Sequence, residues 1–148
     1  MSTEKVQIYS ASKKTGEFVD KVLKADKEWK KLLSPSAYSI TTKRGTEPPG
    51  TLTYDEITAL GMFQCVRCGT DLFRNAAKFH SGTGWPSFYE PVSELNVRIQ
   101  EDTSFGMVRT EVLCARCDSH LGHVFDDGPL PTGKRYCMNG AALKFVPD

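Results

Sequence analysis

The sequence predicts a mainly β domain with a helical amino-terminal arm, held together by a bound metal ion. Four of the five cysteines form two Cys-x-x-Cys pairs, a spacing typical of metal-binding knuckles. Beyond residue 61, short β-like runs alternate with turn signals, whereas residues 10–35 carry apolar side chains at helical spacing. A length of 148 residues suits one domain, so we expect residues 1–148 to fold as a single unit.

The amino-terminal arm, at about residues 1–40, is predicted to be helical because apolar residues recur in it at spacings of three and four. Pro35 is expected to end the helix, and the Gly, Pro and Thr residues of segment 41–52 indicate an irregular connection. We expect the apolar face to pack on the rest of the domain, and a helix that binds a partner protein is the alternative. The apolar positions are Phe18, Val19, Val22, Leu23, Trp29, Leu32 and Leu33.

The remaining chain, at about residues 61–146, is predicted to form a metal-stapled β core. Turn signals such as Asp126-Asp127-Gly128-Pro129 separate its strands. The pattern indicates a compact antiparallel β domain. The expected strands cover residues 62–65, 91–97, 107–113, 123–125, 135–138 and 142–146.

The composition excludes several classes of protein. The chain has 19 basic and 18 acidic residues, so neither a polybasic nucleic-acid-binding surface nor an acidic tail is expected. No apolar run approaches the roughly 20 residues that a membrane-spanning helix needs. Residues 1–5 lead into no apolar segment of a secretory signal. We expect a cytoplasmic protein with no nucleic-acid or membrane partner.

Five cysteines cannot all pair within one chain, and their spacing indicates a metal site. Cys65 and Cys68 form the first pair, and Cys114 and Cys117 form the second. Two such knuckles supply four thiolates to one tetrahedral Zn²⁺, which leaves no open position and predicts one structural ion per chain. His120 is an alternative fourth ligand. A thioredoxin-like redox pair would need a βαβ context, which the sequence does not show.

Cys137 is left outside this zinc site and lies in a predicted strand. Alternation along the strand puts Arg135, Cys137 and Asn139 on one face. A cationic Arg135 beside the sulfur favours the nucleophilic thiolate, and Asn139 is able to donate a hydrogen bond to it. His120 and His123 offer imidazoles of the kind that accompany catalytic cysteines. The alternative is a small buried cysteine, with histidines that support the zinc site or are satisfied polar residues.

Three long segments carry further motifs. The first covers residues 78–88 and contains Gly84-Trp85-Pro86, which on its own indicates only a turn with a core tryptophan. The second covers residues 109–129, and the third covers residues 131–139. Together with Gly45-Thr46-Glu47, these segments extend over about two-thirds of the chain in one uninterrupted order. In this combination the sequence strongly resembles the B-type methionine sulfoxide reductases.

This resemblance implies that the chain reduces the R epimer of methionine sulfoxide, in proteins or as the free amino acid, to methionine. It also implies a mainly β fold of two antiparallel β-sheets, the β-tent, with amino-terminal and peripheral helices. The four-cysteine zinc is expected to lie away from the active site.

The chemistry of a sulfoxide explains the site that the resemblance implies. Its sulfur is electrophilic once its oxygen is protonated or hydrogen-bonded, so the reaction needs a thiolate and a proton donor. Attack leaves a sulfenic acid on the enzyme and releases methionine, while an aromatic wall suits the methyl group and selects the epimer. The residues implied are the nucleophile Cys137, its supports Asn139 and Arg135, the oxygen-binding and protonating His120 and His123, and the methyl-contacting Trp85.

The sequence departs from many family members at the resolving cysteine, whose position is occupied here by Thr83. The neighbouring Ser81 and Gly82 are not thiols either. We therefore expect a one-cysteine enzyme, whose Cys137 sulfenic acid is reduced by an external thiol. Thioredoxin is the favoured reductant, and glutathione with glutaredoxin or a small dithiol are alternatives. We expect the protein to be a monomer.

Two other functions fit parts of the sequence. A zinc-ribbon module that binds protein or nucleic acid would leave Cys137 inert. Such modules tend to carry a basic stripe with interleaved aromatic residues, and this chain is nearly neutral. A redox sensor would use Cys137 without turning over a substrate. The combination of Trp85, His120, His123 and Cys137 favours the enzyme, because a binding module does not need it.

Overall fold

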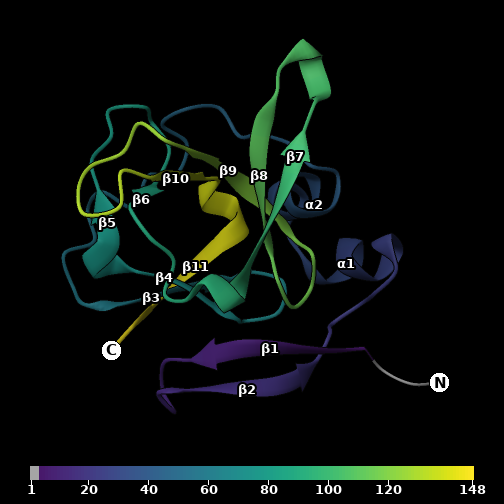
Figure 1. The fold of residues 1–148 in the computed structure, drawn as a ribbon. Coiled ribbons are helices and arrows are strands. Elements are labelled where there is room, and N and C mark those ends of the chain that lie inside the picture. The colour runs from purple at the N-terminus through teal and green to yellow at the C-terminus, as the bar shows by residue number, and fades with distance from the viewer. Residues whose placement is uncertain (1–3) are drawn as a thin grey trace.

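The computed structural model describes residues 4–148 and shows a mainly β protein with antiparallel sheets, as expected (Figure 1). Within these residues, a small sheet pairs β1 (Lys5–Ser10) with β2 (Thr15–Asp20). A six-stranded sheet has the order β5-β6-β10-β9-β8-β7, and a three-stranded sheet has the order β11-β3-β4. The two larger sheets form the core and correspond to the two antiparallel sheets that were expected. The β1–β2 hairpin forms a third, smaller sheet that was not expected.

The strands of the two larger sheets are short, and two α-helices and four 3-10 helices connect the elements of residues 4–148. The strands are β3 (Gly61–Cys65), β4 (Asp71–Arg74), β5 (Lys78–Phe79), β6 (Ser87–Phe88), β7 (Val97–Asp102), β8 (Arg109–Cys114), β9 (His120–Phe125), β10 (Arg135–Met138) and β11 (Leu143–Pro147). The helices are α1 (Asp26–Leu32), α2 (Pro35–Thr42), η1 (Asn75–Ala77), η2 (Glu94–Asn96), η3 (Ser104–Gly106) and η4 (Gly140–Ala142).

The prediction of a helical arm is wrong for most of its length. The β1–β2 hairpin occupies the first half, and burial along β2 alternates, with Glu17 and Val19 half-buried and Phe18 exposed. This period of two is that of a strand. The helical spacing comes from counting apolar residues of β2, such as Phe18, together with those of α1. These residues belong to two different elements, so their combined spacing does not describe one helix.

α1 ends at Leu32, close to the end expected near Pro35, and Pro35 then begins a second helix, α2. The hydroxyl of Ser34 accepts a hydrogen bond from the backbone N–H of Ala37 at 3.2 Å, so Ser34 is the N-cap of α2 and Pro35 is its first residue. Proline suits this position because its missing N–H would have no partner there anyway. No helix within residues 4–148 is long and apolar enough to cross a membrane.

The expected core strands 62–65, 107–113, 135–138 and 142–146 match β3, β8, β10 and β11 within two residues. The expected strand 123–125 is the second half of β9. The strand expected at 91–97 is wrong, because η2 lies there and β7 begins only at its end. β7 is an edge strand whose four central residues are exposed, so it lacks the alternation on which strand prediction depends.

The core lies between the three-stranded and the six-stranded sheet. Phe63 and Phe73 are directly paired on β3 and β4 and are fully buried. Phe73 stacks on Phe88 of β6 with ring centroids 4.5 Å apart, and Phe63 meets the same ring edge-on at 5.3 Å. Aromatic residues of both sheets thus join them, and the opposite face of the six-stranded sheet is left for other contacts.

Candidate functional site

The four cysteines of the two knuckles are gathered at one point. Their Sγ atoms all lie within 4.8 Å of one another, and the pairs Cys65–Cys117 and Cys68–Cys114 are each 3.6 Å apart. Thiolates on a tetrahedral Zn²⁺ lie about 3.8 Å apart, given Zn–S bonds of about 2.3 Å. The cluster is therefore positioned to bind a metal ion. His120 is not part of it, so the site with three cysteines and one histidine is wrong.

The two knuckles have the same backbone geometry. In the first, the N–H of Gly69 donates to the carbonyl of Cys65 at 2.9 Å, and in the second Asp118 donates to Cys114 at 2.9 Å. Gly69 and Asp118 both adopt a positive φ, of 79° and 60°. Because one knuckle follows β3 and the other follows β8, a bound ion would join the two larger sheets.

Strand register places polar side chains in one row across the six-stranded sheet. On β10, Cys137 is paired with His123 of β9. On β8, Glu111 is paired with His123 on one side and with Gln100 of β7 on the other. Directly paired residues project from the same face of a sheet, so these four side chains line one surface.

His120 and His123 share this surface although they are three residues apart. In a regular strand, residues an odd number apart point to opposite faces. Here Val112 is paired with Gly122, while the next residue, Leu113, is paired with His120, so the pairing skips one residue of β9. This β-bulge re-aims His120. The two imidazole centroids lie 5.6 Å apart, edge to face.

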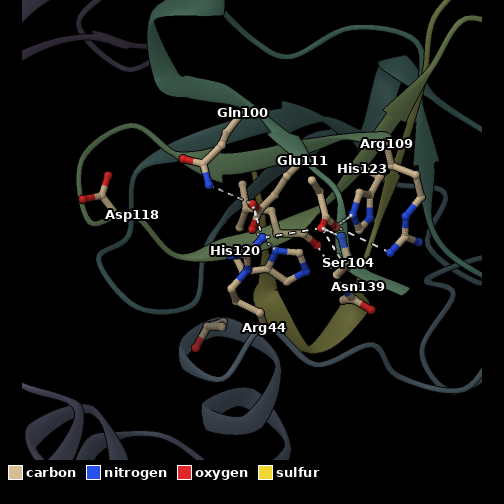
Figure 2. Close-up of polar contacts among 12 residues, drawn as sticks. Arg44, Gln100, Ser104, Arg109, Glu111, Asp118, His120, His123 and Asn139 are labelled. Carbon is tan, nitrogen blue, oxygen red and sulfur yellow. Dashed lines mark hydrogen bonds and ion pairs between the residues drawn. The ribbon is translucent and has the colours of Figure 1, made fainter. Parts of the chain in front are cut away.

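A buried carboxylate holds His120. Nδ1 of His120 lies 2.6 Å from Oε2 of Glu111, whose side chain is fully buried. The other oxygen of Glu111 accepts hydrogen bonds from Arg44 at 2.6 Å and Gln100 at 3.3 Å (Figure 2). Burying a charge is costly unless it is paired. Arg44 therefore stabilises the carboxylate, and the carboxylate orients the imidazole.

Burial lowers the pKa of His120, although the Glu111 carboxylate opposes this shift. A neutral His120 donates its Nδ1–H to Glu111. Its Nε2 is shielded from solvent and has no hydrogen-bond partner among residues 4–148. A buried polar atom without a partner costs about 1–3 kcal/mol, so this nitrogen is a point at which a ligand or water would be stabilised.

A second carboxylate holds His123. Nε2 of His123 lies 2.8 Å from Oδ2 of Asp102, and Oδ1 accepts the backbone N–H and the hydroxyl of Ser104 at 3.0 and 2.7 Å. Arg109 approaches Oδ2 at 3.5 Å (Figure 2). The hydrogen bond to His123, followed by those from Ser104, holds the pKa of Asp102 well below its usual range. With Nε2 occupied, Nδ1 of His123 remains for a ligand.

Cys137 lines a pocket of about 260 Å³ on this face. A neighbouring cavity of about 470 Å³ contains His120, and His123 lines both. The structure thus brings five of the six residues expected at the reacting centre into one pocket and places the sixth, His120, beside it. The five are Cys137, His123, Asn139, Arg135 and Trp85.

Burial raises the pKa of the Cys137 thiol. Arg135 and the hydroxyl of Thr83 act in the opposite direction, but burial has the larger effect. Arg135 is itself paired with Asp127 through two hydrogen bonds of 2.8 and 3.1 Å, and its guanidinium lies 4.4 Å from the centre of the Phe125 ring. Arg135 therefore lowers the pKa of the Cys137 thiol, as expected, but burial raises this pKa by more.

Glu47 fastens two residues of the pocket. Its carbonyl accepts the indole N–H of Trp85 at 2.9 Å, and its backbone N–H donates to the side-chain oxygen of Asn139 at 3.1 Å. The amide nitrogen of Asn139 donates to the carbonyl of Leu121 at 3.1 Å. The expected hydrogen bond from Asn139 to Cys137 is not among those of residues 4–148, because this amide joins two backbone segments instead.

The sequence matches a known family over most of its length. Residues 33–147 match the SelR domain. The peptide methionine sulfoxide reductase MsrB of Methanosarcina barkeri is 53% identical over 126 residues, which cover 84% of this chain and 87% of that protein. The enzyme of the same name from Thiobacillus denitrificans is 55% identical over 124 residues, covering 84% and 94%. The chain belongs to the B-type methionine sulfoxide reductase family.

The SelR match begins at residue 33, directly after α1, so the β1–β2 hairpin and α1 precede the SelR domain. Among solved structures, the crystal structure of the Mis18 'Yippee-like' domain aligns with a TM-score of 0.48 and 23% identity. That alignment covers 59% of this chain and 95% of the other.

Sequence reasoning missed several polar residues of this reductase-family site. Glu111 carried a signal, because an acid that precedes the apolar run Val112-Leu113 in a predicted strand indicates a buried carboxylate that needs a partner. Asp102 and Arg44 carried none. Both lie in polar stretches of the sequence, and only the fold brings them to the histidines.

Proposed function

We propose that the protein is a peptide-methionine (R)-S-oxide reductase, which reduces the R epimer of methionine sulfoxide, in proteins or free, to methionine. The observation that carries this proposal is the direct cross-strand pairing of Cys137 with His123 inside one pocket. A thiol and an imidazole on one wall are the two groups that sulfoxide reduction requires.

Cys137 is proposed as the nucleophile. Its thiolate attacks the sulfoxide sulfur, the substrate S–O bond breaks, and the oxygen ends on Cys137 as a sulfenic acid. Two electrons pass from the cysteine sulfur to the substrate, whose sulfur leaves as the thioether of methionine. Because burial raises the pKa of Cys137, Arg135 and Thr83 are needed to offset the cost of forming the thiolate.

His123 is proposed to protonate the sulfoxide oxygen. Its Nε2 is directed to Asp102, so the Nδ1 of a protonated ring donates to the substrate in the Cys137 pocket. His120 lies beside this pocket, and its unpartnered Nε2 supports a role in binding the same oxygen or a water next to it. Removing negative charge from the oxygen makes the sulfur electrophilic, and this is the contribution of the imidazole pair.

Trp85 is proposed to form the wall for the substrate methyl group. The bond from its indole N–H to Glu47 fixes the ring and leaves the apolar face for contact. A fixed apolar wall in the same pocket as the fixed imidazole of His123 allows only one epimer to place its methyl group and its oxygen correctly. Asn139 supports the pocket by holding β10 to the segment around Glu47.

Regeneration is proposed to need an external thiol, with thioredoxin as the reductant. Thr83 lines the pocket beside Cys137, where a resolving cysteine would have to lie. A first thiol displaces the sulfenic oxygen as water and forms a mixed disulfide with Cys137. A second thiol then breaks that disulfide, so that the reductant leaves oxidised and the Cys137 thiol is restored.

The four-cysteine cluster is proposed to hold one structural zinc ion. Its sulfur distances fit a tetrahedral ion, and four thiolates leave no position for a substrate. When bound, zinc supplies a cross-link between the sheets that carry the two knuckles. None of the four cysteines lines the Cys137 pocket or the cavity beside it.

The test is to incubate the protein with each epimer of N-acetyl-methionine sulfoxide and dithiothreitol, and to measure methionine. We expect turnover of the R epimer only, and none by Cys137→Ser with an unchanged zinc content. Activity on neither epimer would contradict the proposal and favour a zinc-binding module. Full activity of Cys137→Ser would remove the nucleophile that the proposal names.

A further inference from the structure

The larger cavity beside the Cys137 pocket has no assigned ligand. It has a volume of about 470 Å³ and extends from His123 and Arg109, which also line the Cys137 pocket, to Phe105 in the β7–β8 turn. The two cavities therefore meet. The reacting thiol lies in one, and the tip of a hairpin bounds the other.

The tip of this hairpin exposes a cluster of apolar side chains. Figure 1 shows β7 and β8 extending well beyond the rest of the six-stranded sheet, with η3 at the end. Phe105 is 88% exposed, Val108 is 75% exposed, and Met107 between them is about half exposed. Single exposed apolar residues are ordinary, but a cluster on a protruding turn indicates a binding surface.

The backbone of the turn holds Phe105 outward. Its φ of 57° lies in the left-handed region, which is unfavourable for a bulky aromatic residue. Such a conformation persists only where the surroundings impose it. Here the Asp102 carboxylate accepts both the N–H and the hydroxyl of Ser104 and so fixes the start of the turn.

The same carboxylate connects the turn to the site. Oδ1 of Asp102 holds Ser104, and Oδ2 holds His123 at 2.8 Å. One side chain therefore sets the position of the hairpin tip relative to the imidazole that faces Cys137. A ligand bound across the tip would be aligned with the reacting groups.

The charges of the cavity indicate what it binds. Arg44 and Arg109 line it together with Glu101 and Asp102. Arg44 is paired with Glu111, and Arg109 is paired with Asp102, so neither arginine offers a free charge to an anion. A lining with donors and acceptors but a balanced charge suits the amide groups of a polypeptide.

We propose that this cavity and the hairpin tip bind the polypeptide that flanks the methionine sulfoxide, with an apolar side chain of the substrate against Phe105 and Val108. The inference rests on the proposed function, because the flanking chain is placed only when its sulfoxide side chain occupies the Cys137 pocket. The expected substrate is an extended segment that carries an apolar residue close to the oxidised methionine.

The test compares two substrates in the full-length protein. One is N-acetyl-methionine-R-sulfoxide methylamide, which carries no flanking residues, and the other is a ten-residue peptide with leucines around one methionine-R-sulfoxide. In the variant Phe105→Asn/Val108→Ser, kcat/KM for the peptide should fall about fivefold to tenfold through KM, and the small substrate should be unaffected. Asparagine tolerates the left-handed conformation, so the turn should be preserved.

The matched control is Phe18→Asn, which removes a phenylalanine that is 73% exposed on β2, away from the hairpin tip (Figure 1). This control should leave kcat/KM unchanged for both substrates. Phe105→Leu should retain most of the activity on the peptide. If Phe105→Asn/Val108→Ser lost kcat/KM equally for both substrates, or lost none for the peptide, the inference would be overturned but the proposed function would stand. A wild-type protein inactive on both substrates would contradict the proposed function, and the inference with it.

Discussion

His120 and His123 face the same surface of the six-stranded sheet, although their spacing would send them to opposite faces of a regular strand. The β8–β9 pairing skips one residue between them, and the imidazole centroids come to lie 5.6 Å apart. Each ring then meets its own carboxylate, Glu111 for His120 and Asp102 for His123. The bulge therefore makes a pair of oriented imidazoles out of two residues that alternation would separate.

The first prediction concerns the carboxylate behind His120. Glu111→Gln keeps the size of the side chain but removes the charge that orients the ring, so kcat should fall about tenfold or more with a small change in KM. The pH profile of kcat should also shift, because Glu111 opposes the lowering of the His120 pKa by burial. Gln100→Ala, which removes only the weaker 3.3 Å bond to Glu111, is the control and should stay near wild type. Equal kcat values for Glu111→Gln and wild type would show that His120 needs no such positioning.

The second prediction concerns stability at low pH. The folded-state pKa of Asp102 is depressed, so its carboxylate stabilises the protein above the ordinary aspartate pKa of about 3.9, and this contribution is lost as the pH falls further. Asp102→Asn should therefore unfold more easily than wild type at pH 7, and the difference should shrink below about pH 4. Urea unfolding at a series of pH values measures this. A difference in stability that widens on acidification would contradict the depressed pKa of Asp102 in the folded protein.

The third prediction concerns the reactivity of Cys137. Because burial raises its pKa, the rate of alkylation by iodoacetamide should rise about tenfold per pH unit from pH 7 to 9 without a plateau. Arg135→Met should slow alkylation at each pH, since Arg135 lowers this pKa. Peptide mapping by mass spectrometry identifies the modified thiol, and Cys137→Ser provides the blank. A plateau below pH 7 would mean a thiolate already formed at neutral pH.

The elements that could be predicted from sequence are those with a local cause. The cysteine spacing is enough to place the two thiolates of each knuckle together, because each knuckle is a single turn, and two such knuckles predict one shared metal ion. Strand alternation is enough to bring Cys137 and Arg135 to one pocket. The motif resemblance then adds Trp85, and the family to which the chain belongs is confirmed by the match over residues 33–147.

The elements that could not be predicted depend on contacts between distant segments. The β1–β2 hairpin is held from outside, by Asn96, whose side-chain amide bonds both the N–H and the carbonyl of Tyr9 at 2.7 and 2.9 Å. One side of β2 is covered only when this contact docks the hairpin on the domain, so the alternating exposure of β2 is a result of the fold. Asp102 of β7 likewise reaches His123 of β9 across the intervening strand β8, and nothing in the local sequence around either residue indicates this hydrogen bond.

The fourth prediction concerns the zinc. The purified protein should contain one zinc per chain, and removing it with a strong chelator should lower the unfolding temperature markedly, because binding of structural zinc contributes directly to folding. Cys68→Ser should lose metal and stability together. Cys137→Ser should retain both, and atomic absorption with thermal unfolding distinguishes the two variants. A metal-free wild type with unchanged unfolding would contradict a structural role.

The fifth prediction concerns the missing resolving cysteine. Thr83 and Cys137 line the same pocket, and the Thr83 hydroxyl is close enough to act on the thiol. Thr83→Cys should therefore convert the Cys137 sulfenic acid into an internal disulfide after one turnover, with release of water. In wild type, the same turnover without reductant should leave a sulfenic acid that dimedone traps. Ser81→Cys is the control, because its side chain is adjacent to Thr83 but does not line the pocket. An internal disulfide to Cys137 in the wild-type protein would show instead that one of the knuckle cysteines leaves its cluster to resolve the intermediate.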